Sequence, residues 1–402
     1  MSNRVFILAA MLLCAMSLPA KTQQESIDSI KSLIREFKLK YAPDKRTAVF
    51  NIVAEKTNNA LILKGETNQL EGKNQLIDNL NQPGLFLKDS VRLLPDTALH
   101  HKIYGLVNLS VICMRSGPDY MDGLDTQTIL GSPVRILEKK GWWRIQSADN
   151  YIGWTHYSSI VPLTKSELER WNRSTKVIVT NIQTYGYTRP NKQSQIVSDL
   201  IAGNRLKLLK KQGQFYKVAY PDGKEAWLPV EDAMEEQTWL KSRHPDADHL
   251  IATAYRMMGF PYLWGGTSVK GMDCSGFIKT CAFLNGLILA RDASQMAYTG
   301  KCYTSDNYKD WKPGDLLFFG RPASNGKKEH VSHVGLYLGN GRFIHCMGYV
   351  HIGSFNPEDT TYYDEYDKNR FLWAVNILDH IGTPGIQLIS KNPLYQSVIA
   401  EK

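Results

Sequence analysis

The stretches Pro261-Tyr262-Leu263-Trp264-Gly265-Gly266 and Asp273-Cys274-Ser275-Gly276-Phe277 decide the fold of the C-terminal part of this chain. After them, apolar residues recur with the three-to-four residue period of a helix with one buried face: Phe277, Ile278, Cys281, Ala282 and Leu284. Cys274 therefore falls on the first turn of a predicted helix. Unpaired backbone N–H groups and the positive end of the helix dipole favour a thiolate there, as a nucleophile requires. A free cysteine considered alone is more often a small buried hydrophobic residue.

A second pattern lies downstream, where two alternating runs are joined by Gly339-Asn340-Gly341 and predict a β-hairpin. If these three residues form the loop, Leu338 faces Arg342 and Gly335 faces His345, which places His333 diagonally beside His345 on one face of the sheet. A two-residue loop would put the histidines on opposite faces. In the first register one histidine can take the proton of Cys274 while the other orients its ring, as in acyl transfer. For either histidine alone, a satisfied or solvated strand position is the simpler interpretation.

From about Asp246 to His380 the chain resembles the NlpC-type family (NlpC/p60 superfamily) of bacterial cell-wall cysteine peptidases. The resemblance rests on motifs that occur in the family's order: Tyr262-x-Trp264-Gly265-Gly266, Asp273-Cys274-Ser275-Gly276-Phe277, His333-Val334-Gly335-Leu336-Tyr337 and Phe343-Ile344-His345. It implies a small papain-like α+β domain that cleaves the γ-D-glutamyl to diamino-acid bond of peptidoglycan stem peptides, the diamino acid being lysine or diaminopimelate. By the same resemblance Cys274 is the nucleophile, His333 the general base and His345 the third polar residue, with Tyr262 beside the cysteine.

The first twenty residues read as a secretory signal peptide. Arg4 precedes an apolar run from Val5 to Met16, and the small residue Ala20 ends the segment. The run is shorter than the roughly 20 residues that a membrane-spanning helix needs, and no later run is long enough. Leu13 before Cys14 departs from the lipoprotein pattern. We therefore expect an exported protein without a membrane span, periplasmic in a Gram-negative source and otherwise secreted or wall-associated.

Composition is that of an ordinary globular chain, because 402 residues include 22% charged and 43% hydrophobic residues. The net charge of +9 favours anionic surfaces such as wall polymers. Charge alone would suit nucleic acid or lipid equally, but no motif supports nucleic acid as a partner.

The cysteines argue against a disulfide scaffold. Five remain after the predicted signal peptide, far apart along the chain: Cys113, Cys274, Cys281, Cys302 and Cys346. Cys281 is expected in the core. No Cys-x-x-Cys or His-Glu-x-x-His motif occurs, so we expect neither a metal nor another cofactor, although one cysteine and two histidines could in principle bind a metal.

Between residues 101 and 240 a pattern of short β-strands occurs twice. Gly131 to Leu137 aligns with Gly203 to Leu209, Trp143-Arg144-Ile145 with Tyr216-Lys217-Val218, and Trp154 with Trp227. Strands are expected at Leu106 to Val111, Ser132 to Leu137, Trp142 to Gln146 and Tyr151 to Trp154. The duplication predicts two tandem small barrels, which resemble bacterial Src-homology-3 domains. They would either target the enzyme to the wall or shape its cleft.

In family members with two barrels, the first barrel forms a wall of the active site, and Tyr151 occupies the position that resembles a substrate contact. Such a wall would admit only a free N-terminal L-Ala and give dipeptidyl release. An acidic side chain must then pair the amine; Asp273 and Asp292 are candidates, and Asp119 of the first barrel is a weaker one. The full set of expected substrate contacts is Tyr151, Tyr262, Trp264, Asp273, Ser275, Asp292 and Ser294.

The expected fold is therefore α+β, a papain-like cysteine peptidase domain preceded by two small β-barrels and a short N-terminal α+β element. The element is expected to have helices at Gln24 to Lys38 and Thr67 to Leu80, with two strands in Thr47 to Leu63. The expected segments are the signal peptide at 1–20, the N-terminal element at 21–100, the two barrels at 101–165 and 166–240, the peptidase domain at 246–385 and a tail at 386–402. Three alternatives to dipeptidyl release stay open: an endopeptidase on intact wall peptides, a broader amidase or acyltransferase, and a non-catalytic wall-binding protein.

Overall fold

A computed structural model describes residues 20–57, 60–81, 86–305, 307–324 and 326–396, and they form two compact units divided after Leu94. All but the last residue of the predicted signal peptide lies outside the described residues. Among the residues described, no helix is both long enough and apolar enough to cross a bilayer.

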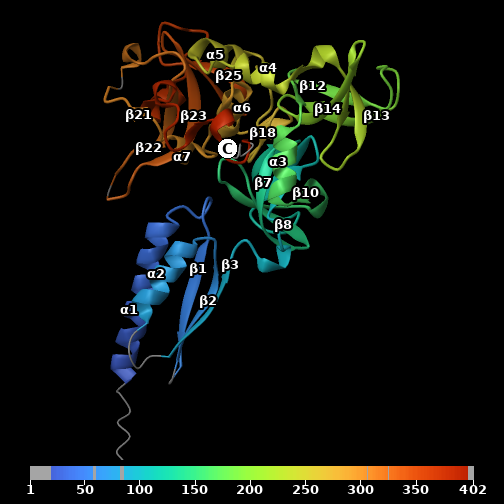
Figure 1. The fold of residues 1–402 in the computed structure, drawn as a ribbon. Helices are drawn as coiled ribbons and strands as arrows, with labels where there is room; N and C mark the ends of the chain where they lie inside the picture. The colour runs from blue at the N-terminus through green and yellow to red at the C-terminus, as the bar shows by residue number, and fades with distance from the viewer. Residues whose placement is uncertain (1–19, 58–59, 82–85, 306, 325, 397–402) are drawn as a thin grey trace, which may run out of the picture. The chain divides into compact units, whose positions relative to one another are not determined.

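The N-terminal unit is a three-stranded sheet with two helices (Figure 1). Its elements are α1 (Ala20–Tyr41), β1 (Phe50–Lys56), β2 (Ala60–Thr67), α2 (Leu70–Leu80) and β3 (Phe86–Leu93). β1 and β2 pair antiparallel, whereas β3 returns through α2 to pair parallel with β2. Both predicted helices and the strand pair are confirmed. β3 was not predicted because its polar run, with only Val91 buried, lacks strand alternation.

The first barrel is a seven-stranded antiparallel sheet in the order β10-β4-β7-β8-β9-β5-β6. Its strands are β4 (Tyr104–Val107), β5 (Val111–Arg115), β6 (Leu124–Ile129), β7 (Pro133–Lys140), β8 (Trp142–Gln146), β9 (Ile152–Thr155) and β10 (Ile160–Leu163). The single strand expected at Leu106 to Val111 is wrong, because a turn at Asn108 to Ser110 divides it into β4 and β5.

The second barrel repeats this topology in the order β13-β12-β16-β15-β14-β11-β17. Its strands are β11 (Lys176–Val179), β12 (Gln183–Tyr187), β13 (Ile196–Ile201), β14 (Arg205–Gln212), β15 (Phe215–Ala219), β16 (Glu225–Pro229) and β17 (Ala233–Glu235). Arg144 faces Trp154 in the first barrel and Lys217 faces Trp227 in the second. The predicted duplication is thereby confirmed at the level of strand register. Helix α3 (Lys165–Arg173) connects the barrels, and α4 (Glu236–Lys241) follows the second.

The C-terminal domain packs helices against a six-stranded antiparallel sheet in the order β21-β26-β22-β23-β24-β25 (Figure 1). The sheet contains β21 (Lys301–Cys302), β22 (Leu316–Arg321), β23 (His330–Gly339), β24 (Arg342–Met347), β25 (Tyr349–Ser354) and β26 (Phe371–Asn376). The remaining elements are α5 (Ala247–Tyr255), β18 (Thr267–Ser268), β19 (Gly271–Met272), α6 (Cys274–Leu284), β20 (Leu287–Leu289), α7 (Ala293–Met296), α8 (Glu365–Asn369) and β27 (Ile386–Leu388). β27, in the segment expected as a tail, pairs with β20.

Helix α6 is the buried centre of this domain. Phe277, Ile278, Cys281 and Ala282 are in one core cluster with residues of β22, β23 and β24, so the predicted helix and the core position of Cys281 are confirmed. The start of α6 packs directly on the Gly265-Gly266 loop. A Cβ atom on Gly276 would lie 1.9 Å from the carbonyl oxygen of Gly266. Only glycine therefore fits at this position of the helix.

We predict that Gly276→Ala lowers the free energy of unfolding by roughly 1–3 kcal/mol, the usual range for overpacking a tight site, because the added methyl group must push the Gly266 backbone away. Denaturant unfolding of the full chain measures the loss. Gly123→Ala is the matched control, since the nearest atom to its added Cβ lies 3.7 Å away. Equal stability of the two variants would contradict the prediction.

Candidate active site

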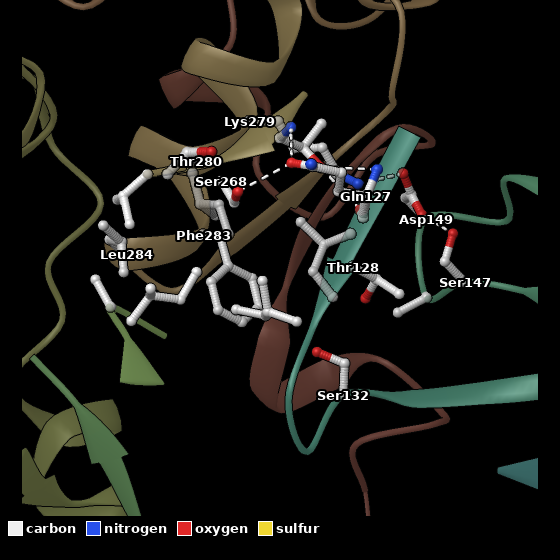
Figure 2. Close-up of a pocket in the computed structure, with 18 of the residues that line it drawn as sticks. Gln127, Thr128, Ser132, Ser147, Asp149, Ser268, Lys279, Thr280, Phe283 and Leu284 are labelled. Carbon is white, nitrogen blue, oxygen red and sulfur yellow. Dashed lines mark hydrogen bonds and ion pairs between the residues drawn. The ribbon is translucent and has the colours of Figure 1, made fainter. Parts of the chain in front are cut away.

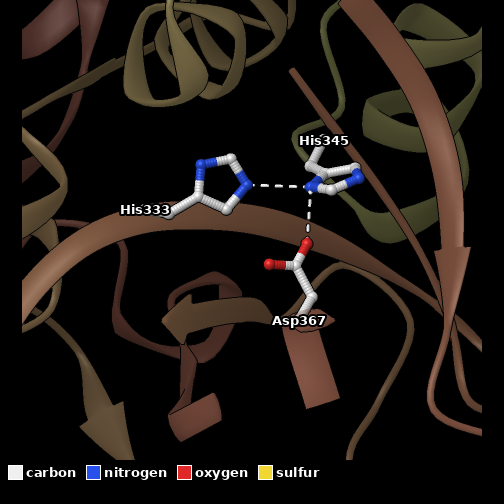
Figure 3. Close-up of side chains that lie close together, drawn as sticks. All are labelled: His333, His345 and Asp367. Carbon is white, nitrogen blue, oxygen red and sulfur yellow. Dashed lines mark hydrogen bonds and ion pairs between the residues drawn. The ribbon is translucent and has the colours of Figure 1, made fainter. Parts of the chain in front are cut away.

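The hairpin β23–β24 brings His333 and His345 together. Gly335 faces His345, as the three-residue loop predicts, but Gly339 instead of Leu338 faces Arg342, because a bulge follows Tyr337. Nε2 of His333 lies 2.8 Å from Nδ1 of His345. The two side chains are buried, and Figure 3 shows the other nitrogen of the His333 ring, Nδ1, pointing away from His345.

Cys274 is the first residue of α6, as predicted, and Asp273 is its N-cap, with Oδ1 accepting from the backbone N–H of Gly276 at 2.7 Å. Burial, with the neighbouring charge of Asp273, raises the pKa of the Cys274 thiol from 9.0 to about 12, although the backbone N–H groups of Val334 and Ser275 act in the opposite direction. The helix start therefore acts on the Cys274 pKa in the expected direction through the Ser275 N–H, but desolvation outweighs it and the net shift is upward.

Burial also disfavours the charged form of His333, the candidate general base. Burial, reinforced by Arg370 and His351, lowers the pKa of His333 from 6.5 to about 3. The contact of Val334 with the sulfur places the β23 segment of His333 against Cys274. Burial thus disfavours the charged form of both side chains.

Arg291 is a buried residue to which sequence reasoning assigned no role. Its Nη2 lies 2.6 Å from Oδ2 of Asp273 and its Nη1 2.9 Å from Oγ of Ser275, while Nε donates to Oγ1 of Thr126 in the first barrel at 2.8 Å. The only available signal was its place directly before Asp292 in the sequence. A buried carboxylate needs a cationic partner, but sequence does not say which cation reaches it.

A fourth buried group, Asp367 of α8, lies beside the histidine pair (Figure 3). Its Oδ2 is 3.2 Å from Nδ1 of His345 and its Oδ1 is 3.4 Å from Nε of Arg370. Neither carboxylate oxygen has a hydrogen-bond partner among the described residues. Burial raises the pKa of Asp367 from 3.8 to about 6, against the opposing effect of Arg370. His333, His345 and Asp367 hold donor atoms within 4.8 Å of one another, a spacing that also suits a metal ion, but the 2.8 Å between the two ring nitrogens is a hydrogen-bond distance.

Three segments of this chain match known protein families, and the chain is similar in sequence to known proteins. Residues 259–370 match the NlpC/P60 family, residues 114–160 the bacterial dipeptidyl-peptidase Sh3 domain and residues 187–232 the bacterial SH3 domain. A Gamma-D-glutamyl-L-lysine dipeptidyl-peptidase of Bacillus cereus is 30% identical over 257 residues, which cover 61% of this chain and 74% of the relative. The chain belongs to the NlpC/P60 family.

A second relative and a solved structure are also similar to this chain. The Gamma-D-glutamyl-L-lysine dipeptidyl-peptidase of Bacillus subtilis is 30% identical over 234 residues, covering 55% of this chain and 72% of the relative. The crystal structure of an NlpC/P60 family protein from Bacillus cereus shares the fold, with a TM-score of 0.58 and 24% identity over 68% of this chain and 99% of that one. The protein is thus a cysteine peptidase of the family that acts on peptidoglycan peptides.

In this NlpC/P60 peptidase the first barrel docks beside the N-terminus of α6. Gln127 of β6 exchanges hydrogen bonds with Thr267 of β18, and its Oε1 accepts from Ser268 at 2.9 Å. Lys279 of α6 pairs with Asp149 of the first barrel at 2.6 Å (Figure 2). A pocket lined by Gln127, Ser268 and Lys279, among others, lies at this junction (Figure 2).

The residues predicted to contact substrate differ in burial and in their bonding partners. Tyr151 is buried and close enough to Arg291 to affect its pKa, and burial together with Cys274 raises the pKa of the Tyr262 hydroxyl. Asp273 and Ser275 are bonded to Arg291. Trp264, by contrast, is 73% exposed.

The other two lie at α7. Asp292 is the N-cap of this helix, and its backbone N–H donates to Gln295 at 3.1 Å, while Ser294 is half-buried in the helix itself. Asp119 is exposed and caps a turn through the N–H of Met121. The structure therefore gathers Tyr151, Tyr262, Asp273 and Ser275 around Cys274 and Arg291, and their contact with substrate stays a prediction.

We predict that Asp367→Asn stabilises the protein at neutral pH but not at acid pH. Because the pKa of Asp367 is higher in the folded than in the unfolded chain, the folded state holds this proton more tightly, and stability falls as the pH rises from about 4 to about 6. The difference between 3.8 and about 6 corresponds to up to roughly 3 kcal/mol. Denaturant unfolding at pH 3.5 and pH 7.5 measures it.

Asp248→Asn is the control for that comparison, because Asp248 is an exposed residue of α5 outside this cluster. A stability gain for Asp367→Asn that is the same at both pH values would refute the pH dependence.

Proposed function

We propose that the protein is an exported γ-D-glutamyl-L-diamino-acid dipeptidyl-peptidase that releases L-Ala-γ-D-Glu from stem peptides with a free N-terminal L-Ala. The observation that carries this proposal is the docking of the first barrel onto the N-terminal end of α6. Thr126 and Tyr151 of that barrel both lie at Arg291, which itself holds Asp273 next to Cys274. A wall at this place shortens the cleft on one side of the nucleophile, and so favours a substrate that begins there. The names of the two Bacillus relatives support the same activity.

The chemistry follows from the three polar residues. Nδ1 of His333 takes the proton of the Cys274 thiol as the sulfur attacks the γ-D-glutamyl carbonyl carbon. The backbone N–H groups at the start of α6 stabilise the resulting oxyanion. His333 then gives its proton to the leaving amine of the diamino acid, and a water molecule, deprotonated by His333, hydrolyses the thioester. His345 holds the His333 ring through the 2.8 Å contact.

Asp292 is the better candidate for pairing the substrate amine. The carboxylate of Asp273 is already bonded to Arg291 and to the backbone N–H groups of Gly265 and Gly276. Asp292 lies farther from Arg291, at 3.8 Å, and its side chain is 27% exposed. The side chain of Asp292 is thus more accessible to a ligand than that of Asp273, which is 10% exposed, as a contact with an ammonium group requires.

We predict that mass spectrometry will detect L-Ala-γ-D-Glu after incubation of the protein with L-Ala-γ-D-Glu-diamino-acid tripeptide, but not with the same peptide carrying a blocked N-terminus. Equal cleavage of both peptides would indicate an endopeptidase instead. Cleavage of neither, together with retention on purified peptidoglycan, would favour the wall-binding alternative. Asp292→Asn should lower kcat/KM for the free tripeptide roughly 10- to 100-fold, the range expected for loss of a charge-assisted contact of about 1.5–3 kcal/mol.

We also predict that Cys274→Ala abolishes release of the dipeptide while the fold is retained, because the sulfur is the attacking atom and alanine fits the same buried position. Product formation and the circular dichroism spectrum measure the two effects. Cys281→Ala is the matched control, since Cys281 lies on the same helix but in the core. A folded Cys274→Ala variant that still turns over substrate would refute the assignment of Cys274 as the nucleophile.

A further inference from the structure

Three histidines form a continuous hydrogen-bonded line across β23, β24 and β25. Nε2 of His333 lies 2.8 Å from Nδ1 of His345, and Nε2 of His345 lies 3.0 Å from Nε2 of His351. Nδ1 of His351 lies 2.9 Å from the carbonyl oxygen of Tyr349. His345 and His351 face each other in the strand register, so the backbone itself fixes this contact. His351 had no role in the sequence analysis.

The hydrogen bond from His351 to the Tyr349 carbonyl, at the end of this line, determines which ring nitrogen of each histidine carries the proton. A carbonyl oxygen only accepts, so Nδ1 of His351 carries a proton, and whenever this ring is uncharged its Nε2 presents a lone pair. Nε2 of His345 must then donate, which leaves a lone pair on its Nδ1. Burial keeps His345 and His333 neutral by lowering the pKa of each ring.

By the same reasoning Nε2 of His333 donates to His345, and Nδ1 of His333 is left with a lone pair. This is the tautomer that can accept the thiol proton of Cys274. The opposite tautomer would present an N–H group to the sulfur and could not act as a base.

Asp367 is the group that competes with this arrangement. Its carboxylate lies 3.2 Å from Nδ1 of His345, and an ionised carboxylate attracts a proton to that nitrogen. A proton there would leave lone pairs facing each other between His345 and His351. The other charged groups near the line are Arg370, 3.4 Å from Asp367, and Asp364, which lies with His345 and His351 in one cluster.

We propose that His351 is a positioning residue that, anchored by the Tyr349 carbonyl, sets the tautomer of His333 through His345. His351 touches no reacting atom. Its Nε2 accepts the hydrogen bond that Nε2 of His345 donates and so opposes the pull of Asp367 on the His345 proton. The proposal rests on the role of His333 as general base in the proposed function, but the tautomer itself is measured without substrate.

The test compares His351→Leu, which removes the acceptor, with His351→Gln, which restores an acceptor oxygen. In the full-length protein labelled with ¹⁵N-histidine, long-range ¹H–¹⁵N correlation spectra report the tautomer of each ring, and His333→Gln assigns the His333 signals. We expect the Nε2–H form of His333 in the unmodified protein and in His351→Gln, and a mixture with the Nδ1–H form in His351→Leu. We expect kcat to fall about 10-fold or more in His351→Leu, as loss of one buried hydrogen-bond partner implies, with KM changed less than twofold and with recovery in His351→Gln.

His101→Leu is the control, because His101 is an exposed residue of the first barrel outside this network. An unchanged His333 tautomer in His351→Leu would overturn the proposal, whether or not activity falls, since a fall would then reflect only a structural role. Failure of the unmodified protein to cleave either tripeptide would instead count against the proposed function, while the spectra would still decide the tautomer.

Discussion

The buried ion pair between Asp273 and Arg291 is the interaction on which the rest of the site depends. It joins the N-cap of α6 to the segment before α7, and through Thr126 it reaches the first barrel. Removing one partner of a buried pair typically costs about 3–5 kcal/mol, because the other charge is left uncompensated. The same guanidinium also binds Ser275, so the residue after Cys274 is held by the side chain that contacts the barrel. Domain docking and positioning of Cys274 are therefore one structural feature.

Burial is the second constraint on the site, because it raises the pKa of the Cys274 thiol. The rise of the Cys274 pKa from 9.0 to about 12 corresponds to roughly 4 kcal/mol in favour of the thiol. A helix N-terminus contributes typically about 0.3–1 kcal/mol in the opposite direction. Desolvation thus outweighs the helix terminus. Under the proposed function, in which His333 takes the thiol proton, reactivity would depend on the orientation and tautomer of His333 more than on a preformed anion.

Local patterns predicted the parts of the structure that depend on local rules. Loop length set the facing of Gly335 and His345, and the spacing of glycine and tryptophan residues revealed the duplicated barrels. The pairing of Leu338 with Arg342 failed, because a bulge is a local irregularity that alternation does not show. Arg291, His351 and Asp367 were missed for a different reason. Each acts through a partner on another element, and a lone charged or polar residue gives no signal of which partner it meets in the fold.

The duplication itself raises the question of what the second barrel does, since only the first reaches Arg291 in these contacts. Arg205 of the second barrel is buried, donates to the carbonyl oxygen of Gly131 at 2.9 Å and pairs with Glu236. Asn204 donates to the carbonyl oxygen of Ser110, also at 2.9 Å. Both acceptors belong to turns of the first barrel, next to β5 and β7. Two backbone carbonyls of the first barrel are thus held by side chains of the second. If the first barrel forms the cleft wall of the proposed function, these contacts give the second copy a part in positioning that wall against α6.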